Sequence, residues 1–393
     1  MNKKWLILTL VFTTLLLAQR PAAPVLGEAT NPATPTGTAW QQIEKLLPTL
    51  IEDVESLGDA VAMADDTLAV ANYSGDRVHV YTRAGALWQE AGFLQRSTPT
   101  PLLAPLDMAT DGDTIVVGYQ EVVYVYQKPA TGWQTMTETA VLTASDNELN
   151  DDFGTAVAVA GDTIVVGAPL DRYGPPAGSY GAAYVFVRSG SAWNSTSETA
   201  KLTADNAGSL DHFGTSVAIA GDTIVIGSDG AEGSTTNAGG VYIFEEPLGG
   251  WVTTSNDAAF LTDSDGELGA GLGVSVAINS DATVVAAGEY RDEEFVNQGG
   301  AINLFVRPGG GWTDMSETAK LTPATPIEGE NLGRSVAIWG DTIIGGADGL
   351  DDFIPGAAYI FDGRPAVGQT VTKPNGLSLM TTQKVMPLAR PSP

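Results

Sequence analysis

The chain has 393 residues, a formal net charge of −28, and 43% hydrophobic residues, and it contains no cysteine. The excess of Asp and Glu repels nucleic acid and anionic membrane surfaces, so neither is an expected partner. The lack of cysteine excludes disulfides, thiol nucleophiles and Cys-ligated metals. Two histidines, His79 and His212, are too few for a His-based zinc site. His79 lies in an alternating strand pattern, and we expect it to face outward.

The first 29 residues have the pattern of a secretory signal peptide. Lys3 and Lys4 precede an apolar run from Trp5 to Ala18, which is short for a bilayer span. A Pro/Thr-rich linker is expected over 30–39. We expect an exported, monomeric protein, secreted or held in the cell envelope, with no membrane span in the mature chain.

A repeated segment dominates the rest of the sequence. Phe153 to Gly167 and Phe213 to Gly227 share one pattern of small, branched and Gly-Asp positions. Fainter copies begin at Gly58, Pro105, Gly273 and Gly333. A repeat of this length is one supersecondary unit, which can bury its apolar face only against further copies.

Each copy resolves into four short strands. In the fourth copy, Thr215–Ala220 and Thr223–Ile226 flank a Gly-Asp turn, Gly240–Phe244 follows a polar loop, and Trp251 begins the last strand. Four-stranded antiparallel units repeated radially form a β-propeller. The sequence predicts an all-β propeller over 40–363 with six blades, or with seven if a degenerate copy lies in the linker or tail.

A tryptophan precedes every copy and is interpreted as a packing residue between blades. The six are Trp40, Trp88, Trp133, Trp193, Trp251 and Trp312. The last copy ends near Phe361 after three strands, whereas the Trp40 segment precedes the first complete copy. We therefore predict that an N-terminal strand near Trp40 completes the last blade and closes the ring, which removes exposed strand edges. The tail, 364–393, is predicted to be a flexible extension.

The repeat resembles the FG-GAP repeat of integrin α-subunits and of many bacterial exported proteins. The resemblance rests on Phe153-Gly154 with Gly167-Ala168-Pro169, and on Phe213-Gly214 with Gly227-Ser228. It implies a propeller used in binding and adhesion. Calcium-binding members carry an Asp-rich run between the first two strands. Here that turn is only Gly-Asp, so calcium cannot be assigned to it by resemblance.

Acidic residues are predicted to gather on one face of the ring. We call upper the face with the loops between second and third strands and the connections to the next blade. The upper loops contain only two cations, Arg172 and Arg291. The lower turns hold Arg83, Lys128, Arg188 and Arg307, with Glu245 and Glu246 as acidic exceptions. Loops of this kind often form the binding face of repeat proteins. The residues predicted for it are Asp171, Asp211, Asp229, Asp263, Asp265, Glu289 and Asp292.

Two upper loops carry enough oxygen ligands to be candidate calcium sites, and Ca²⁺ is the only cofactor considered. Their ligands would be Asp146, Asn150, Asp151 and Asp152 in one loop, and Asp348, Asp351 and Asp352 in the other. Neither loop has the spacing of an EF-hand. The alternative is that Asp and Asn are present because they tolerate turn geometry.

No catalytic constellation stands out, so the sequence predicts a non-enzymatic protein. The favoured function is an exported binding or adhesion module whose acidic face holds an extracellular protein, a glycan or a cation-bridged ligand. One alternative is a calcium-dependent secreted hydrolase acting on a phosphate ester or a polysaccharide. The other is a passive structural protein of the envelope.

Overall fold

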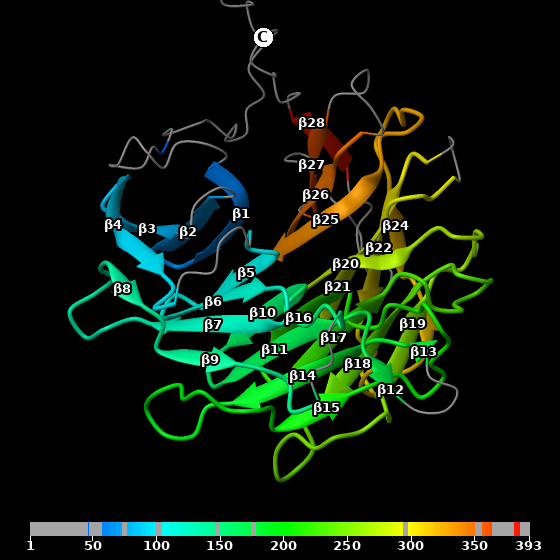
Figure 1. Ribbon diagram of the computed structural model, residues 1–393. Helices are drawn as coiled ribbons and strands as arrows, with labels where there is room; N and C mark the ends of the chain where they lie inside the picture. The colour runs from blue at the N-terminus through cyan, green and yellow to red at the C-terminus, as the bar shows by residue number, and fades with distance from the viewer. Residues whose placement is uncertain are drawn as a thin grey trace, which may run out of the picture. The chain divides into compact units, whose positions relative to one another are not determined.

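The computed structural model describes residues 46, 57–72, 77–98, 104–146, 150–173, 178–293, 298–349, 356–363 and 381–385. Within these residues every regular element is a β-strand, and the strands form six antiparallel sheets arranged in a ring (Figure 1). The predicted six-blade β-propeller with four-stranded blades is confirmed.

Each blade is built from strands in chain order, from the innermost strand outward. Blade one contains β1 (Leu57–Ala64), β2 (Thr67–Asn72), β3 (Arg77–Ala84) and β4 (Leu87–Gln95). Blade two contains β5 (Asp107–Thr110), β6 (Thr114–Tyr119), β7 (Val122–Gln127) and β9 (Ala140–Leu142). Blade three contains β10 (Ala156–Ala160), β11 (Thr163–Ala168), β14 (Ala182–Val187) and β15 (Ala200–Leu202).

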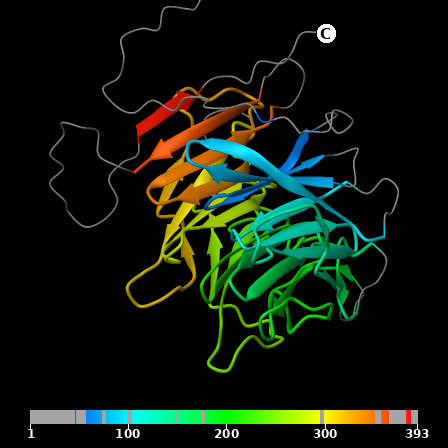
Figure 2. The ribbon, with the colours of Figure 1, turned by 90° about the vertical axis from the view of Figure 1, so that its left-hand side faces the viewer.

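The second half of the ring repeats this order. Blade four contains β16 (Ser216–Ala220), β17 (Thr223–Ser228), β18 (Gly240–Glu245) and β19 (Ala259–Thr262). Blade five contains β20 (Leu272–Ile278), β21 (Val284–Glu289), β22 (Ala301–Val306) and β24 (Ala319–Leu321). Blade six contains β25 (Leu332–Trp339), β26 (Thr342–Ala347), β27 (Ala357–Asp362) and β28 (Thr381–Val385). The innermost strands follow one another, β1 beside β5 and so on to β20 beside β25. Figure 2 shows the ribbon from the side, with the sheets coloured in chain order.

Three short pairings lie outside this scheme. β8 (Met136–Thr137) and β23 (Met315–Ser316) lie parallel to the outer strands β4 and β19 of the preceding blades. They cover the outer edges of blades one and four. A small hairpin of β12 (Arg172–Tyr173) and β13 (Gly178–Ser179) lies in the loop between the second and third strands of blade three.

The core lies between neighbouring blades. Phe213, which is fully buried, belongs to a cluster with Val165 and Val185 of blade three and with Ile224 and Tyr242 of blade four. Successive residues of a strand face opposite sides of the sheet. Every second side chain therefore packs against the preceding blade, and the others pack against the following blade. The repeated sequence therefore produces the same interface at successive blades.

The predicted packing role of the tryptophans is confirmed for four of them. Trp133, Trp193, Trp251 and Trp312 are all buried. Trp133 of blade two donates a hydrogen bond through Nε1 to Thr67 Oγ1 of blade one, at 3.1 Å. Trp193 makes the same kind of bond to Thr114 of blade two, whereas Trp251 and Trp312 belong to apolar clusters shared with the preceding blade.

Glycines set the spacing of the blades. A Cβ atom on Gly167, at the end of the second strand of blade three, would lie 2.0 Å from the carbonyl oxygen of Gly214 in blade four. Gly227 has the same relation to Gly273 of the next blade, also at 2.0 Å. The two glycines of the repeat are therefore needed because main-chain atoms of adjacent blades meet there.

Replacing Gly167 with Ala should lower the free energy of unfolding by about 1–3 kcal/mol, because the added methyl group must push two blades apart. Gly309→Ala is the matched control, since a Cβ there meets nothing within 4 Å. Chemical denaturation of both variants checks the prediction. Equal stability of the two variants would contradict the role given to this contact.

At the junction of blades one and six, the described residues leave apolar side chains exposed that are buried at other junctions. Val61 of blade one is 61% exposed, whereas Val157, at the same place in blade three, is 4% exposed. Ile344 of blade six is 42% exposed, whereas its counterpart Val225 in blade four is fully buried. Apolar side chains that face a neighbour elsewhere are thus uncovered by the described residues at this junction.

The structure corrects the prediction of the closing strand. The strand that pairs with β27 is β28, which comes from the tail. The two strands are antiparallel, with Tyr359 opposite Lys384. Part of the segment predicted as a flexible extension therefore forms the fourth strand of blade six. The Trp40 segment, predicted to supply this strand, lies outside the described residues.

The prediction for His79 is also wrong. This histidine in β3 is fully buried, and its Nδ1 lies 2.7 Å from Glu90 Oε1 in β4. An alternating sequence pattern shows that a strand has two different faces. It does not show whether one of these faces is exposed or is covered by neighbouring side chains.

Candidate functional site

The upper loops meet one another through charged side chains. Lys201 rises from the outer strand β15, and its Nζ lies 2.7 Å from Asp146 Oδ2 and 2.9 Å from Asp171 Oδ2. The hydroxyl of Tyr184 donates to Asp146 at 2.8 Å and also to Asp171. Asp146 comes from a connection between blades and Asp171 from the loop after a second strand. The two kinds of loop therefore share one face, as predicted.

This group, the Lys201 triad of Lys201, Asp146 and Asp171, is shielded from water at Lys201 and Asp171, whereas Asp146 is half exposed. Asp171 is only 2% exposed. Burial acts to raise the pKa of Asp146, but hydrogen bonds from Lys201 and Tyr184 hold that pKa below its usual value. Burial alone would lower the pKa of Lys201, and the two carboxylates reverse this and raise it. Asp146 and Lys201 are therefore both charged in neutral solution.

Blade five has a similar triad of Lys320, Asp265 and Asp292. Lys320 Nζ lies 2.8 Å from Asp265 Oδ2 and 2.5 Å from Asp292 Oδ2. A further acid, Glu289, lies 3.4 Å from the same ammonium group and accepts a 2.6 Å hydrogen bond from Asn303 Nδ2.

Glu289 is fully buried, and one of its oxygens, Oε1, has no hydrogen-bond partner among the described residues. Burial raises the pKa of Glu289 to about 8, against the opposing effect of Lys320 and with support from Asp263 and Asp292. Glu289 is thus mainly protonated near neutral pH.

Blade four has neutral residues at all three triad positions. Asn206 stands eight residues before Gly214, as Asp146 stands eight before Gly154, and Ala231 and Phe260 replace the second Asp and the Lys. Lys201 lies opposite Tyr184 in register, as Phe260 lies opposite Tyr242. Phe260 stacks on Tyr242 with centroids 4.5 Å apart. Lysine and both aspartates are thus present or absent together, which indicates a self-contained structural unit.

The remaining predicted binding residues also bond within the protein. Asp211 accepts a hydrogen bond from the backbone of Gly208, and Asp263 accepts one from Gly266 at 2.8 Å. Asp229 lies 3.0 Å from His212 Nδ1, and this bond raises the pKa of the histidine. Five of the seven predicted carboxylates are buried: Asp171, Asp211, Asp263, Glu289 and Asp292. Their role in ligand binding stays a prediction.

The first candidate calcium loop is divided among several partners. Asp146 belongs to the Lys201 triad, and Asp151 is buried with Oδ1 3.9 Å from Arg172 Nη1. Asp152 accepts a 3.3 Å hydrogen bond from the side chain of Gln120, and Asn150 is exposed. The structure does not bring these four side chains into one cluster.

In the second loop, Asp348 bonds to Arg334 Nε and to Asn331 Nδ2, both at 3.1 Å. Asp351 and Asp352 lie outside the described residues. In the part of the chain that the structure describes, no group of three or more acidic or histidine side chains is arranged to hold a metal ion. Calcium binding stays a prediction for both loops.

Three cations of the upper face were missed in the sequence. Lys201, Lys320 and Arg334 belong to strands, and their side chains extend to the upper face. The prediction of this face took only loop residues into account. One signal was available: the sequence Ala-Lys-Leu recurs at 200–202 and 319–321, and a lysine inside an apolar strand requires a partner.

The upper face also exposes apolar side chains at corresponding connections. Leu210 is 61% exposed, Leu268 is 78% exposed and Ile327 is 43% exposed, and they lie in the connections that lead into blades four, five and six. Exposed acids lie in two of these connections, namely Asp205 and Glu328, and in the upper loops after the second strands of blades four and five, namely Glu232 and Glu293. The upper face thus combines aliphatic side chains with an acidic surround.

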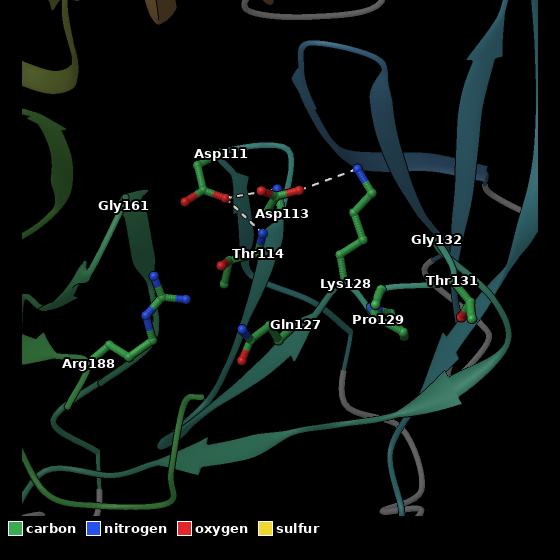
Figure 3. Close-up of a pocket in the computed structure, with 11 residues that line it drawn as sticks. Asp111, Asp113, Thr114, Gln127, Lys128, Pro129, Thr131, Gly132, Gly161 and Arg188 are labelled. Atoms are coloured by element: carbon green, nitrogen blue, oxygen red, sulfur yellow. Dashed lines mark hydrogen bonds and ion pairs between the residues drawn. The ribbon is translucent and has the colours of Figure 1, made fainter. Parts of the chain in front are cut away.

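The lower face is hollowed between blades two and three. A polar hollow of about 630 Å³ is lined by Asp111 and Lys128 of blade two and by Arg188 of blade three (Figure 3). Lys128 Nζ lies 3.3 Å from Asp113, and Arg188 Nε donates to Asp162 at 2.8 Å. The two cations of this hollow are therefore balanced by acids beside them.

Fold and sequence together define a repeat β-propeller. A model of the FG-GAP repeat matches residues 136–186, 196–244 and 315–361, which fall in blades two to six. The chain thus carries FG-GAP repeats within a β-propeller, as the Phe-Gly and Gly-Ala-Pro positions predicted. Across the described residues there is no helical segment with the length and hydrophobicity that a membrane crossing requires.

Comparison with curated protein sequences gave no match. Among solved structures, the WD40 repeats of RRP9 are similar with a TM-score of 0.51 and 12% identity, over 79% of this chain and 77% of that one. Hsv2 of Kluyveromyces lactis is similar with a TM-score of 0.48 and 10% identity, over 79% and 82%. The likeness to RRP9 concerns the fold alone.

Proposed function

We propose that the protein is a non-catalytic binding module that holds an extracellular protein against its upper face. The observation that carries the proposal is the exposure of Leu210, Leu268 and Ile327, one in each of three successive connections. Exposed aliphatic groups within a polar surround are characteristic of protein interaction sites. An FG-GAP propeller provides a suitable scaffold for such a role.

The charge of the upper face favours a basic partner. Exposed acids surround the aliphatic side chains, and the whole chain carries a formal net charge of −28. Complementary charge speeds association and selects the partner, whereas the buried apolar centre supplies most of the affinity. The signal-like N-terminus supports an extracellular location for this binding.

The test uses a photo-crosslinking amino acid at position 210 or 268, with position 248 as the control. Leu248 is fully exposed in the lower turn after β18, so it matches the two test residues in chemistry but not in face. We expect one extracellular protein, identified by mass spectrometry, to be captured from 210 and 268 and not from 248.

The captured protein is then purified and its affinity measured. Leu268→Asp should weaken binding at least tenfold, because it places a charge in the apolar contact, whereas Leu248→Asp should leave the affinity unchanged. Equal capture from all three positions, or equal affinity of the two variants, would remove the support for this face. Binding of a glycan array alone would favour a sugar ligand instead.

A further inference from the structure

Two arginines from different blades converge on one tyrosine of the upper face. Tyr290 directly follows β21 of blade five, and Arg291 is the next residue. The Cζ atom of Arg291 lies 4.7 Å from the centroid of the Tyr290 ring. Arg334, in the inner strand β25 of blade six, places its Cζ at 4.7 Å from the same centroid. The ring therefore holds both guanidinium groups near the junction of the two blades.

The charges of this pair are only partly balanced by the protein. Arg334 donates through Nε to Asp348 Oδ2 at 3.1 Å, and no described residue accepts a hydrogen bond from its terminal Nη atoms. Arg291 is exposed and makes no ion pair with any described residue. The two guanidinium groups thus have one carboxylate partner between them among the described residues, on a face that is otherwise acidic.

Such a pair is prepared for an oxyanion. The planar guanidinium group offers parallel N–H donors that match the two oxygens of a carboxylate. Contact with the aromatic ring restrains both long side chains before any ligand arrives, which lowers the entropy lost on binding. A bound anion would also relieve the repulsion between the two cations.

The surroundings limit which anions fit. Gly271, whose Cβ would lie 2.7 Å from the Tyr290 ring, shows that the connection after Leu268 packs directly against the ring. The exposed acids Glu293 and Glu328 lie in the adjoining loops. They would repel a polyanion along its length, whereas a single carboxylate needs only the space at the two arginines.

We propose that Arg291 and Arg334, held by Tyr290, form a carboxylate-binding subsite for the protein partner. The inference rests on the proposed function, because Leu268 and Ile327 lie in the connections that lead to the two blades of this subsite. The partner would present a carboxylate to the arginines and apolar side chains to the neighbouring leucine and isoleucine. An otherwise basic partner would thus be fixed in one orientation.

The subsite is tested without the partner, by titrating the full chain with acetate and following the arginine Nε–H signals by NMR. Saturable shifts are expected at Arg291 and Arg334. Arg291→Gln should raise the apparent dissociation constant at least tenfold, and it should leave the fold intact because Arg291 is exposed. Arg172→Gln, on the same face but paired with Asp151, is the control and should change nothing.

Shifts that are absent, or that are the same in Arg291→Gln and Arg172→Gln, would overturn the subsite. A second titration uses inorganic phosphate. Stronger shifts with acetate than with phosphate would support a carboxylate site, whereas stronger shifts with phosphate would overturn the assignment. Crosslinking at positions 210 and 268 tests the proposed function independently of the subsite. Capture there without acetate shifts would reject only the subsite, and acetate shifts without capture would reject only the partner.

Discussion

Replacing Lys201 with Phe should lower the free energy of unfolding by about 3–5 kcal/mol, because removal of one member of a buried ion cluster leaves charge without compensation. Asp171 would remain 2% exposed with no ammonium group beside it. The Tyr184 hydroxyl would still donate to Asp171 but carries no positive charge. This is the largest loss of stability that we expect from a single change on the upper face.

The triple variant Lys201→Phe, Asp146→Asn, Asp171→Ala should regain most of that loss. It copies the arrangement that blade four already uses, in which Phe260, Asn206 and Ala231 occupy the same places and Tyr242 donates to the Asn side chain at 2.6 Å. Replacing a buried ion group as a whole by well-packed neutral residues is often neutral or stabilising. The three substitutions should therefore be strongly non-additive.

Urea denaturation of the single and triple variants measures both effects. A triple variant that is less stable than Lys201→Phe would show that the triad is not a separable unit. A single variant as stable as the natural chain would mean that water or other groups compensate Asp171. Leu248→Asp, a substitution of an exposed lower-face residue, is the control. It should change the free energy of unfolding by no more than about 0.5 kcal/mol.

The second large effect concerns the pH dependence of stability through Glu289. Its pKa is about 8 in the folded protein, above the usual 4.5, so the folded state binds this proton more tightly than the unfolded state. The resulting stability is complete below pH 4.5 and is lost as the pH rises toward 8. Over this range Glu289 should lower the free energy of unfolding by up to about 1.4 kcal/mol per pH unit.

Glu289→Gln removes this dependence, because the amide cannot ionise and can still accept the hydrogen bond from Asn303. The variant and the natural chain should be equally stable at pH 4.5, and the variant should be clearly more stable at pH 8. Glu246→Gln, an exposed lower-face substitution, is the control and should keep the natural slope. Parallel curves for the natural chain and Glu289→Gln would contradict the burial argument.

The sequence predicted the blades well because the repeat records the blade interface directly. Gly167 and Gly214 recur where main-chain atoms of adjacent blades meet, and the tryptophans recur where blades are joined. The completion of blade six by β28 was not predicted, since the tail contains no full copy of the repeat. One strand carries too little pattern to show which open edge it joins.

The site was harder to predict because loops were treated as independent of strands. Sorting loop residues located the acidic face but could not show that Lys201 and Lys320 enter it from outer strands and neutralise several of its acids. The convergence of Arg291 and Arg334 on Tyr290 joins two blades and has no counterpart in the repeat. Contacts that occur once in a repeat protein leave no periodic trace.

The close approach of Gly167 to the Gly214 carbonyl has a consequence for how such proteins diversify. Main-chain atoms determine the distance between blades at this contact, so exposed positions of the upper loops are not needed to hold the ring together. Such positions can drift while the scaffold keeps its dimensions. A laboratory library that randomises the exposed positions Leu210, Leu268 and Ile327, and leaves these glycines and the buried acids of the same connections untouched, should therefore yield folded proteins with new binding specificities.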